Sequence, residues 1–148
     1  MLREARAIWR NGPYTGEGVL STPSGILNNT KYTFGSLTGL QVQTSPCEML
    51  SAAIASSISR MVAVEMAKVG IEPAQVETDA VLTLDFLGEA PHIVGAHLNI
   101  TARANDAGYE QFQEAVESAR RACPISSVLN IDLHCEARLV STADHAIA

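Results

Sequence analysis

Hydrophobic and polar residues alternate in short runs through the first part of the chain. The runs cover residues 5–9, 18–22 and 31–36, and the turn-forming segments Asn11-Gly12-Pro13 and Pro23-Ser24-Gly25 separate them. Alternation with a period of two is typical of a strand with one buried face. Short turns between consecutive strands favour antiparallel pairing. The pattern therefore predicts an antiparallel meander of three strands between Arg3 and Ser36.

A long helix is predicted from Pro46 to Val69. Pro46 suits the first helical position, and Ser45 and Glu48 have the spacing of a capping box, with Gly70 as the stop. Apolar residues and serines occupy almost every face of this helix. After Glu48 its only charged residues are Arg60, Glu65 and Lys68. A helix that is apolar all round must be buried all round, so we expect a second subunit to cover it.

Two long strands follow the helix, over Gln75–Phe86 and His92–Ala104. Their alternation is regular, and the connection around residues 88–91 is short, which predicts a hairpin. In the second strand the inner positions are Val94, Ala96, Leu98 and Ile100.

A second helix and a last strand complete the predicted order. Asp106 is a candidate N-cap for a helix that runs to about Ala122, where Cys123-Pro124 ends it, and residues 124–129 are expected to form one further turn. The last strand is predicted over Ile131–Val140, with its odd-numbered residues inside. Three strands, a long helix, two strands, a helix and a strand indicate the α+β class.

The length and the charge of the chain bear on its number of domains and on its partners. The chain has 148 residues, the usual size of one globular domain, so we expect a single domain over residues 1–148. Only 18% of the residues are charged, against about 25% in typical domains, which also favours a large subunit interface. A net charge of -6 argues against a nucleic-acid partner.

Localisation is predicted from three further features. No apolar run of about 18 residues lacks a charge, which predicts no membrane span. The first ten residues, MLREARAIWR, lack the apolar segment of a signal peptide. Cys47, Cys123 and Cys135 form an odd set that fits no closed disulfide framework and suits a reducing compartment. We therefore expect a soluble cytoplasmic protein.

Two separated motifs carry a resemblance to a known family. The first is Ser45-Pro46-Cys47-Glu48-Met49-Leu50, continued by alanines and serines as far as Ser57, and the second is Cys123-Pro124-Ile125-Ser126. The pattern resembles the OsmC/Ohr family of osmotically inducible protein C and organic hydroperoxide resistance proteins, the OsmC branch more than the Ohr branch. The resemblance covers nearly the whole chain, and the predicted element order agrees with it.

The resemblance implies an intertwined homodimer, in which two long helices pack centrally and both chains contribute strands to the surrounding sheets. It also implies a thiol peroxidase of the peroxide stress response. In typical members, a cysteine in the long helix attacks the hydroperoxide and becomes a sulfenic acid. The cysteine of the C-P-x-S motif then condenses with it to a disulfide, which a dithiol partner reduces. An arginine and a glutamate keep the attacking thiolate ionised. No cofactor is implied.

This sequence departs from the family pattern at three positions. Counted from Pro46, Ser57 stands at the position of the attacking cysteine, and Cys47 stands at the position of the glutamate. Leu37 stands at the arginine position, and only the resolving cysteine, Cys123, remains. Because a hydroxyl cannot enter the thiol oxidation ladder, we expect peroxidase activity to be lost or changed.

Several functions stay open at this point. Cys47 lies in the first helical turn, where the helix dipole favours a thiolate, so residual thiol chemistry through Cys47 and Cys123 is one alternative to inert cysteines. Ten residues separate Cys47 from Ser57, about 15 Å of helix, so a disulfide partner would have to approach the helix start. Another alternative is a binding module for a small apolar ligand in the former active-site pocket. A purely structural role is the third.

Other reactive side chains are interpreted more simply. Cys135 has the apolar phase of the last strand and is expected in the core. Ser57 lacks a G-x-S-x-G elbow, so it is not expected to act as a hydrolase nucleophile. His92, His97 and His134 lie in strands without metal-ligand spacing, and His145 lies near the end of the sequence, so we predict no metal site.

Overall fold

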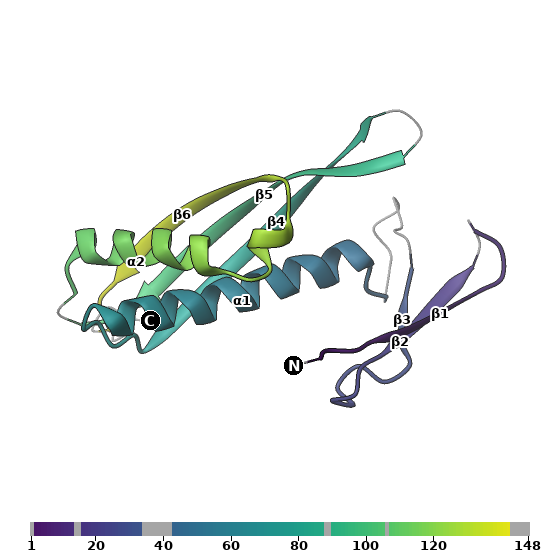
Figure 1. Cartoon of the computed structure of the whole chain (residues 1–148), viewed down its shortest axis with the longest axis horizontal. Coiled ribbons are helices and arrows are strands. Elements are labelled where there is room, and N and C mark those ends of the chain that lie inside the picture. The colour runs from purple at the N-terminus through teal and green to yellow at the C-terminus, as the bar shows by residue number, and fades with distance from the viewer. Residues whose placement is uncertain (1, 14–15, 34–42, 88–89, 106, 143–148) are drawn as a thin grey trace, which may run out of the picture. The chain divides into compact units, whose positions relative to one another are not determined.

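The computed structural model describes residues 2–13, 16–33, 43–87, 90–105 and 107–142 (Figure 1). Contacts divide the chain into two compact units, residues 1–50 and 51–148. The expectation of a single domain stays a prediction.

The N-terminal unit contains a three-stranded antiparallel sheet of β1 (Arg6–Arg10), β2 (Glu17–Ser21) and β3 (Thr30–Tyr32), in the order β1-β2-β3. The predicted meander is confirmed, although β3 is shorter than expected. Gly18 and Tyr32 are paired across β2 and β3. A Cβ atom at Gly18 would lie 2.3 Å from Tyr32 Cε1, so only glycine lets the ring cross the strand there.

Helix α1 (Pro46–Lys68) begins and ends at the signals in its sequence. Ser45 N donates to Glu48 Oε2 at 3.2 Å, and Glu48 N donates to Ser45 Oγ at 3.1 Å, which confirms the capping box. Gly70 has φ of +80°, the left-handed conformation that ends many helices, and Ile71 N donates back to Met66 O. The helix ends one residue before the predicted Val69.

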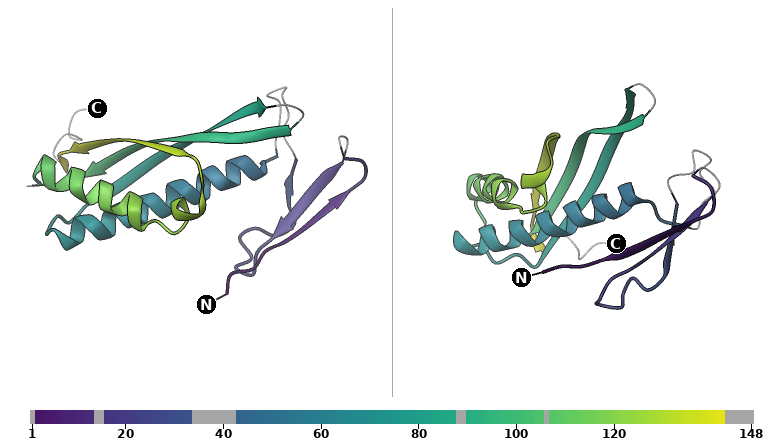
Figure 2. Two further views of the ribbon diagram at one scale, coloured as in Figure 1. Left: turned by 45° about the horizontal axis from the view of Figure 1, so that its top comes forward. Right: turned by 45° about the vertical axis from the view of Figure 1, so that its right-hand side comes forward.

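The C-terminal unit contains a second sheet in the order β4-β5-β6. Strands β4 (Gln75–Leu87) and β5 (Ala90–Arg103) form the predicted antiparallel hairpin, and β6 (Asp132–Val140) pairs with β5 in parallel. The connection from β5 to β6 contains helix α2 (Tyr109–Ala122) and the 3-10 turn η1 (Ser126–Val128). Both helices lie on the same face of this sheet (Figure 2). The α+β class is confirmed.

The core of this unit lies between that sheet face and the two helices. Helix α1 contributes every fourth residue from Ile54 to Met66, and α2 contributes a stripe at a spacing of three and four residues from Phe112 to Ala119. The largest of the core's fully buried side chains are Ile54, Ile58, Val62, Met66, Leu98, Phe112 and Cys123. Ser59 Oγ, next to this stripe, donates to Thr78 Oγ1 at 2.8 Å and fixes α1 on β4.

Two local predictions are wrong. Val94, predicted to face inward, is 40% exposed, because the pairing shifts between Thr83 and Leu84 and leaves an extra residue in β5. The N-cap of α2 is Gly108, with extended backbone and no side-chain cap, and not Asp106, which lies outside the described residues. Local propensity placed the cap too early because residues 107 and 108 continue the loop.

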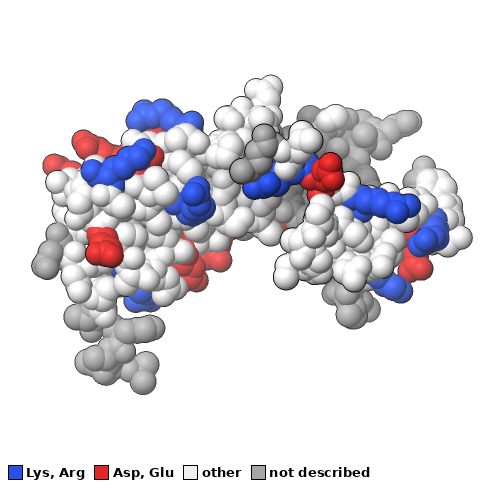
Figure 3. Space-filling view, turned by 60° about the horizontal axis from the view of Figure 1, so that its bottom comes forward, with Lys and Arg blue, Asp and Glu red and all other residues white. Residues whose placement is uncertain are grey.

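Helix α1 is buried on one side only. Its buried residues are Ile54, Ile58, Val62, Glu65 and Met66. By length and composition α1 could also cross a membrane, with a mean hydropathy of 1.3 in its most apolar window. The charges of α1 therefore do not exclude a membrane span, contrary to the prediction from the sequence. The central helix of a soluble protein passes the same test. On the side that Figure 3 views, most of the surface is uncharged, with Lys, Arg, Asp and Glu scattered over it.

Candidate functional site

The centre of α1 and the end of α2 meet at a hydroxyl and a thiol. Ser57 Oγ lies 3.2 Å from Cys123 Sγ, and either atom can donate the hydrogen bond. Cys123 is completely buried, while Ser57 is half-buried on α1. Residues 66 positions apart in the chain thus share one polar contact inside an apolar core.

The backbone after α2 is shaped around the same sulfur. Cys123 is the C-cap of α2, with ψ of 117°, because Pro124 has no N–H and cannot continue the helix. The chain then turns through η1, where Ser127 N donates to Cys123 O at 3.0 Å. This turn aims Ser126 N at Cys123 Sγ, at 3.4 Å. The Cys-Pro-Ile-Ser sequence therefore folds back on its own first side chain.

These neighbours change the acidity of the thiol. Burial alone would raise the pKa of Cys123, because it disfavours the thiolate. The hydroxyls of Ser126 and Ser57 and the backbone N–H groups of Ser126 and Ile125 outweigh burial, so the pKa of Cys123 lies below its ordinary value. The site therefore stabilises a sulfur anion with neutral donors.

Ser126 takes a further part in this arrangement. Its Oγ is buried, and no atom of the described residues meets it at hydrogen-bond geometry. The hydroxyl is nevertheless close enough to lower the pKa of Cys123. Its proton is free to turn towards the sulfur when the thiolate forms. The sequence assigned Ser126 no role, although its place in the Cys-Pro-Ile-Ser motif was the available signal.

The remaining sequence-predicted residues lie elsewhere. Cys47 is half-buried in the first turn of α1, and Cys135 is half-buried in β6, where burial raises its pKa. Cys47, Cys123 and Cys135 form no disulfide with one another. Leu37 and His145 lie outside the described residues. The structure thus brings Ser57 and Cys123 together and does not add Cys135 to them.

The histidines are arranged differently from the interpretation of the sequence. His97 and His134 are paired across β5 and β6, with their ring centroids 5.0 Å apart, whereas the sequence treats them as unrelated. His92 lies on β5 opposite Asp85 and outside this pair. The sequence does not reveal this pair, because the spacing of residues along one strand does not show which residues lie opposite them on the neighbouring strand.

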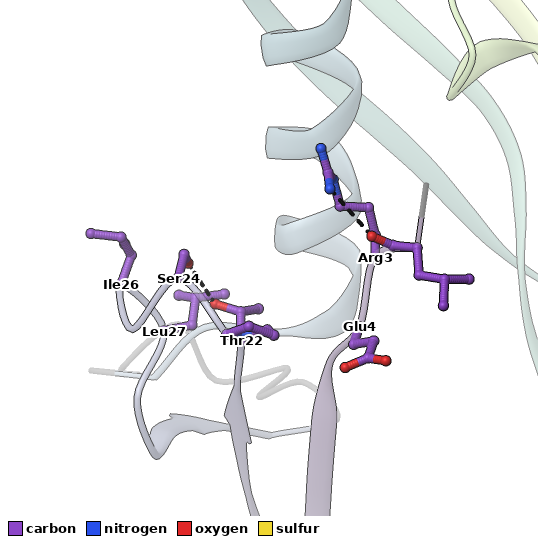
Figure 4. Close-up of a pocket in the computed structure, with 8 residues that line it drawn as sticks. Arg3, Glu4, Thr22, Ser24, Ile26 and Leu27 are labelled. Atoms are coloured by element: carbon purple, nitrogen blue, oxygen red, sulfur yellow. Dashed lines mark hydrogen bonds between the residues drawn. The ribbon is translucent and has the colours of Figure 1, made fainter.

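A separate hollow lies in the N-terminal unit and has a volume of about 850 Å³ (Figure 4). Neither Ser57 nor Cys123 lines it. Leu2 and Ile26 on its rim are 84% and 85% exposed. Arg3 Nη1 donates to Leu2 O, and the hydroxyls of Thr22 and Ser24 bond to each other at 3.0 Å. The side chains of Arg3, Thr22 and Ser24 thus make their hydrogen bonds to close neighbours in the sequence.

Comparisons with known proteins agree on one family. The family model described as OsmC-like protein matches residues 38–136. The curated Peroxiredoxin OsmC of Escherichia coli (strain K12) is 26% identical over 139 residues, which are 94% of this chain and 97% of that protein. An OsmC-like protein of unknown function from Vibrio cholerae has a similar solved structure, with a TM-score of 0.76 and 14% identity over 93% of this chain and 99% of that one. The organic hydroperoxide resistance protein OhrB of Bacillus subtilis has a TM-score of 0.65 and 20% identity, covering 91% and 98%.

Proposed function

Since this chain belongs to the OsmC-like protein family, we propose that it is a member of the peroxide stress response class whose two-thiol reaction is interrupted at the first step. The observation that carries the proposal is the contact of 3.2 Å between Ser57 Oγ and Cys123 Sγ. A sulfur in place of the Ser57 oxygen would need to move only about 1 Å to reach the S–S bond length. Ser57 thus stands where a disulfide partner of Cys123 would stand.

The chemistry that remains is that of a single thiol. Reduction of a hydroperoxide by a thiolate breaks the O–O bond, leaves a sulfenic acid on sulfur and releases an alcohol after protonation. The Ser57 oxygen cannot take that step, and it cannot condense with an oxidised Cys123 to form a disulfide. The depressed pKa of Cys123 supports a thiolate, but complete burial keeps peroxide from it. Hydroperoxide turnover is therefore lost or greatly reduced.

The same proposal includes a cytoplasmic homodimer. Helix α1 leaves Ala52, Ser56 and Ala67 exposed opposite its buried stripe, and small residues allow two helices to approach closely. A second copy of α1 would cover that face, which the chain's own elements leave open. The cytoplasmic assignment rests on the odd set of three cysteines in the sequence, which fits no closed disulfide framework.

Relocated chemistry through Cys47 is the weaker alternative within one chain. Because Cys123 touches Ser57, a partner for its sulfur has to come from the middle of α1. Cys47 precedes Ser57 by ten residues of continuous helix, about 15 Å of rise. A disulfide needs Cα atoms within about 7 Å, so Cys47 and Cys123 of the same chain would not pair. The small apolar ligand stays a prediction, which a thermal shift assay with fatty acids tests.

The decisive experiment restores the missing sulfur. We expect Ser57→Cys to form a disulfide with Cys123 on mild oxidation, detected by intact mass and peptide mapping. Ser57→Ala and Ser57→Cys with Cys123→Ser are the matched controls and form none. We expect wild-type protein to consume no more tert-butyl hydroperoxide, with a dithiol reductant, than Cys123→Ser does. Adding Leu37→Arg and Cys47→Glu to Ser57→Cys should raise turnover further.

Two outcomes would contradict the proposal. Wild-type turnover close to that of the Escherichia coli relative, assayed alongside, would mean that the reaction is intact and runs through another residue. Failure of Ser57→Cys to oxidise to a disulfide, in protein with unchanged circular dichroism, would mean that Ser57 does not occupy the position of a disulfide partner.

A further inference from the structure

Two histidines and a glutamate gather on the outer face of the second sheet, the face away from α1 and α2. Leu98 and Ile100 of β5 are buried, so the alternating His97 faces the other way. Strand β6 follows the same rule, with His134 and Glu136 exposed beside a half-buried Cys135. This cluster lies on the opposite side of the sheet from the Ser57–Cys123 contact.

The parallel register of β5 and β6 brings the three side chains together. His97 is directly opposite His134, and Glu136 is two residues further along the same face. The two rings are tilted by 33° with centroids 5.0 Å apart, so they lie nearly stacked. Neighbouring strands are about 4.8 Å apart, so the backbone itself sets this spacing.

The donor atoms converge on one carboxylate oxygen. Glu136 Oε1 lies 3.6 Å from His134 Nε2 and 3.9 Å from His97 Nε2. One ligand atom from each residue lies within 4.8 Å of the others. A tetrahedral ion with bonds of about 2.0–2.1 Å holds its ligand atoms about 3.3 Å apart. Small side-chain rotations would therefore bring all three atoms into bonding distance of one ion.

The surroundings are polar and open to solvent. Asn99 Oδ1 lies 3.1 Å from His97 Nε2, and Asp79 is paired with Asn99 across β4 and β5. Asp79, Asn99 and Glu136 line one shallow hollow of about 350 Å³ together with Arg138, which donates to Thr101 Oγ1. An ion on the cluster would keep at least one position for water, because His134 and Glu136 are exposed and leave it uncovered.

We propose that His97, His134 and Glu136 bind one divalent transition-metal ion of the zinc type on the outer face of the β4-β5-β6 sheet. Two imidazole nitrogens and one carboxylate oxygen form a donor set that binds zinc and similar transition-metal ions in preference to calcium or magnesium. The site is independent of the proposed function, since its residues lie on the other face of the sheet.

The test measures binding of Zn²⁺ alone to the full chain by competition with a chromophoric chelator. We expect one ion per chain for the wild type. His97→Ala, His134→Ala and Glu136→Gln should each weaken binding at least about tenfold. Asn99→Asp would add a second carboxylate beside His97 and should tighten binding about tenfold. His92→Ala removes an exposed histidine from the same strand and serves as the matched control, with unchanged affinity.

A spectroscopic measurement separates this site from the thiols. Co²⁺ bound by nitrogen and oxygen gives visible d–d bands, whereas a bound cysteine adds an intense sulfur-to-metal charge-transfer band. We expect the first without the second. A charge-transfer band, affinity lost in His92→Ala or Asn99→Asp, or equal affinity in wild type and a His97→Ala/His134→Ala double variant would each overturn the proposal. Circular dichroism of every variant checks that it folds.

Discussion

Helices α1 and α2 pack on the same sheet face, but they differ in how completely the chain covers their apolar residues. Helix α2 buries a single stripe of Phe112, Ala115, Val116 and Ala119. Its other side carries Glu117, whose Oε1 forms ion pairs with Arg120 Nη2 at 2.7 Å and with Arg121 Nη1 at 3.6 Å. This is the two-sided pattern of a helix that meets core on one side and water on the other.

Helix α1 has a buried stripe too, but its open side carries few charges, among them the exposed Arg60 one turn after Ser56. Opposite Ile54 and Ile58 it presents Ala52 and Ser56, both exposed in the single chain. The difference teaches that the described residues cover the apolar stripe of α2 completely, whereas they leave small residues of α1 exposed. Ser57 lies on α1 and is half-buried, while the thiol that it contacts, Cys123, is already completely buried within the single chain.

The largest effect is expected from a loss of stability in the buried stripe of α2. Phe112 is completely buried, and Phe112→Ala should lower the free energy of unfolding by about 3–5 kcal/mol, because it removes a ring and leaves a cavity. Urea unfolding at constant protein concentration measures this. Tyr109→Ala is the control on the same helix, since Tyr109 is 60% exposed, and it should cost less than about 1 kcal/mol. Equal losses would mean that the stripe of α2 is wrongly identified.

The next effect tests the open face of α1. Ser56→Glu leaves the single chain free to fold, since Ser56 is exposed and its hydroxyl donates to Ala53 O in the same helix. In a dimer it would bury two like charges, so we expect the dissociation constant to rise about 100-fold or more. Analytical ultracentrifugation measures the change.

Ser127→Glu is the matched control for that variant, because Ser127 is an exposed serine with the same kind of bond, to Pro124 O. It should leave the dimer intact. Wild-type protein that is monomeric without detergent and partitions into lipid vesicles would instead show that α1 meets a membrane.

Local signals in the sequence predict the elements well. The capping box of Ser45 and Glu48 and the left-handed Gly70 fix α1 within one residue, since both act over a single turn. The strands are predicted from the alternation of apolar and polar residues, which is also a local signal because successive side chains point to opposite faces of a sheet. Val94 escapes prediction because a bulge depends on the partner strand and not on the residue itself.

The candidate site depends on contacts that local patterns do not encode. The sequence singles out Ser57 and Cys123 through the resemblance, and the Cys-Pro pair explains why α2 ends at the sulfur. The donors that lower the pKa of Cys123 depend on how η1 folds back, and the histidine pair depends on the parallel register of β6. Both are long-range consequences of topology, so only the structure reveals them.

A smaller effect is expected at the start of α1. Ser45→Ala removes the side-chain acceptor for Glu48 N and should lower the free energy of unfolding by about 1 kcal/mol. Chemical denaturation measures it. Ser24→Ala, in the turn after β2, is the control and should change stability by less than about 0.5 kcal/mol. No loss in Ser45→Ala would mean that α1 begins without help from its cap, through the cover on its open face alone.

The smallest effect concerns the thiol that joins the two helices. In a Cys47→Ser/Cys135→Ser background, ultraviolet absorbance of the thiolate reports Cys123 alone. Ser57→Ala removes one donor, so the pKa of Cys123 should rise and its titration should move to higher pH. Because the folded pKa is depressed, Cys123 adds stability as pH rises through that pKa towards the unfolded value, and this gain should shrink in Ser57→Ala. Ser59→Ala, which breaks the bond to Thr78 instead, should leave the titration unchanged. A shift in both variants would mean that the acidity of Cys123 follows the packing of α1 and not the Ser57 hydroxyl.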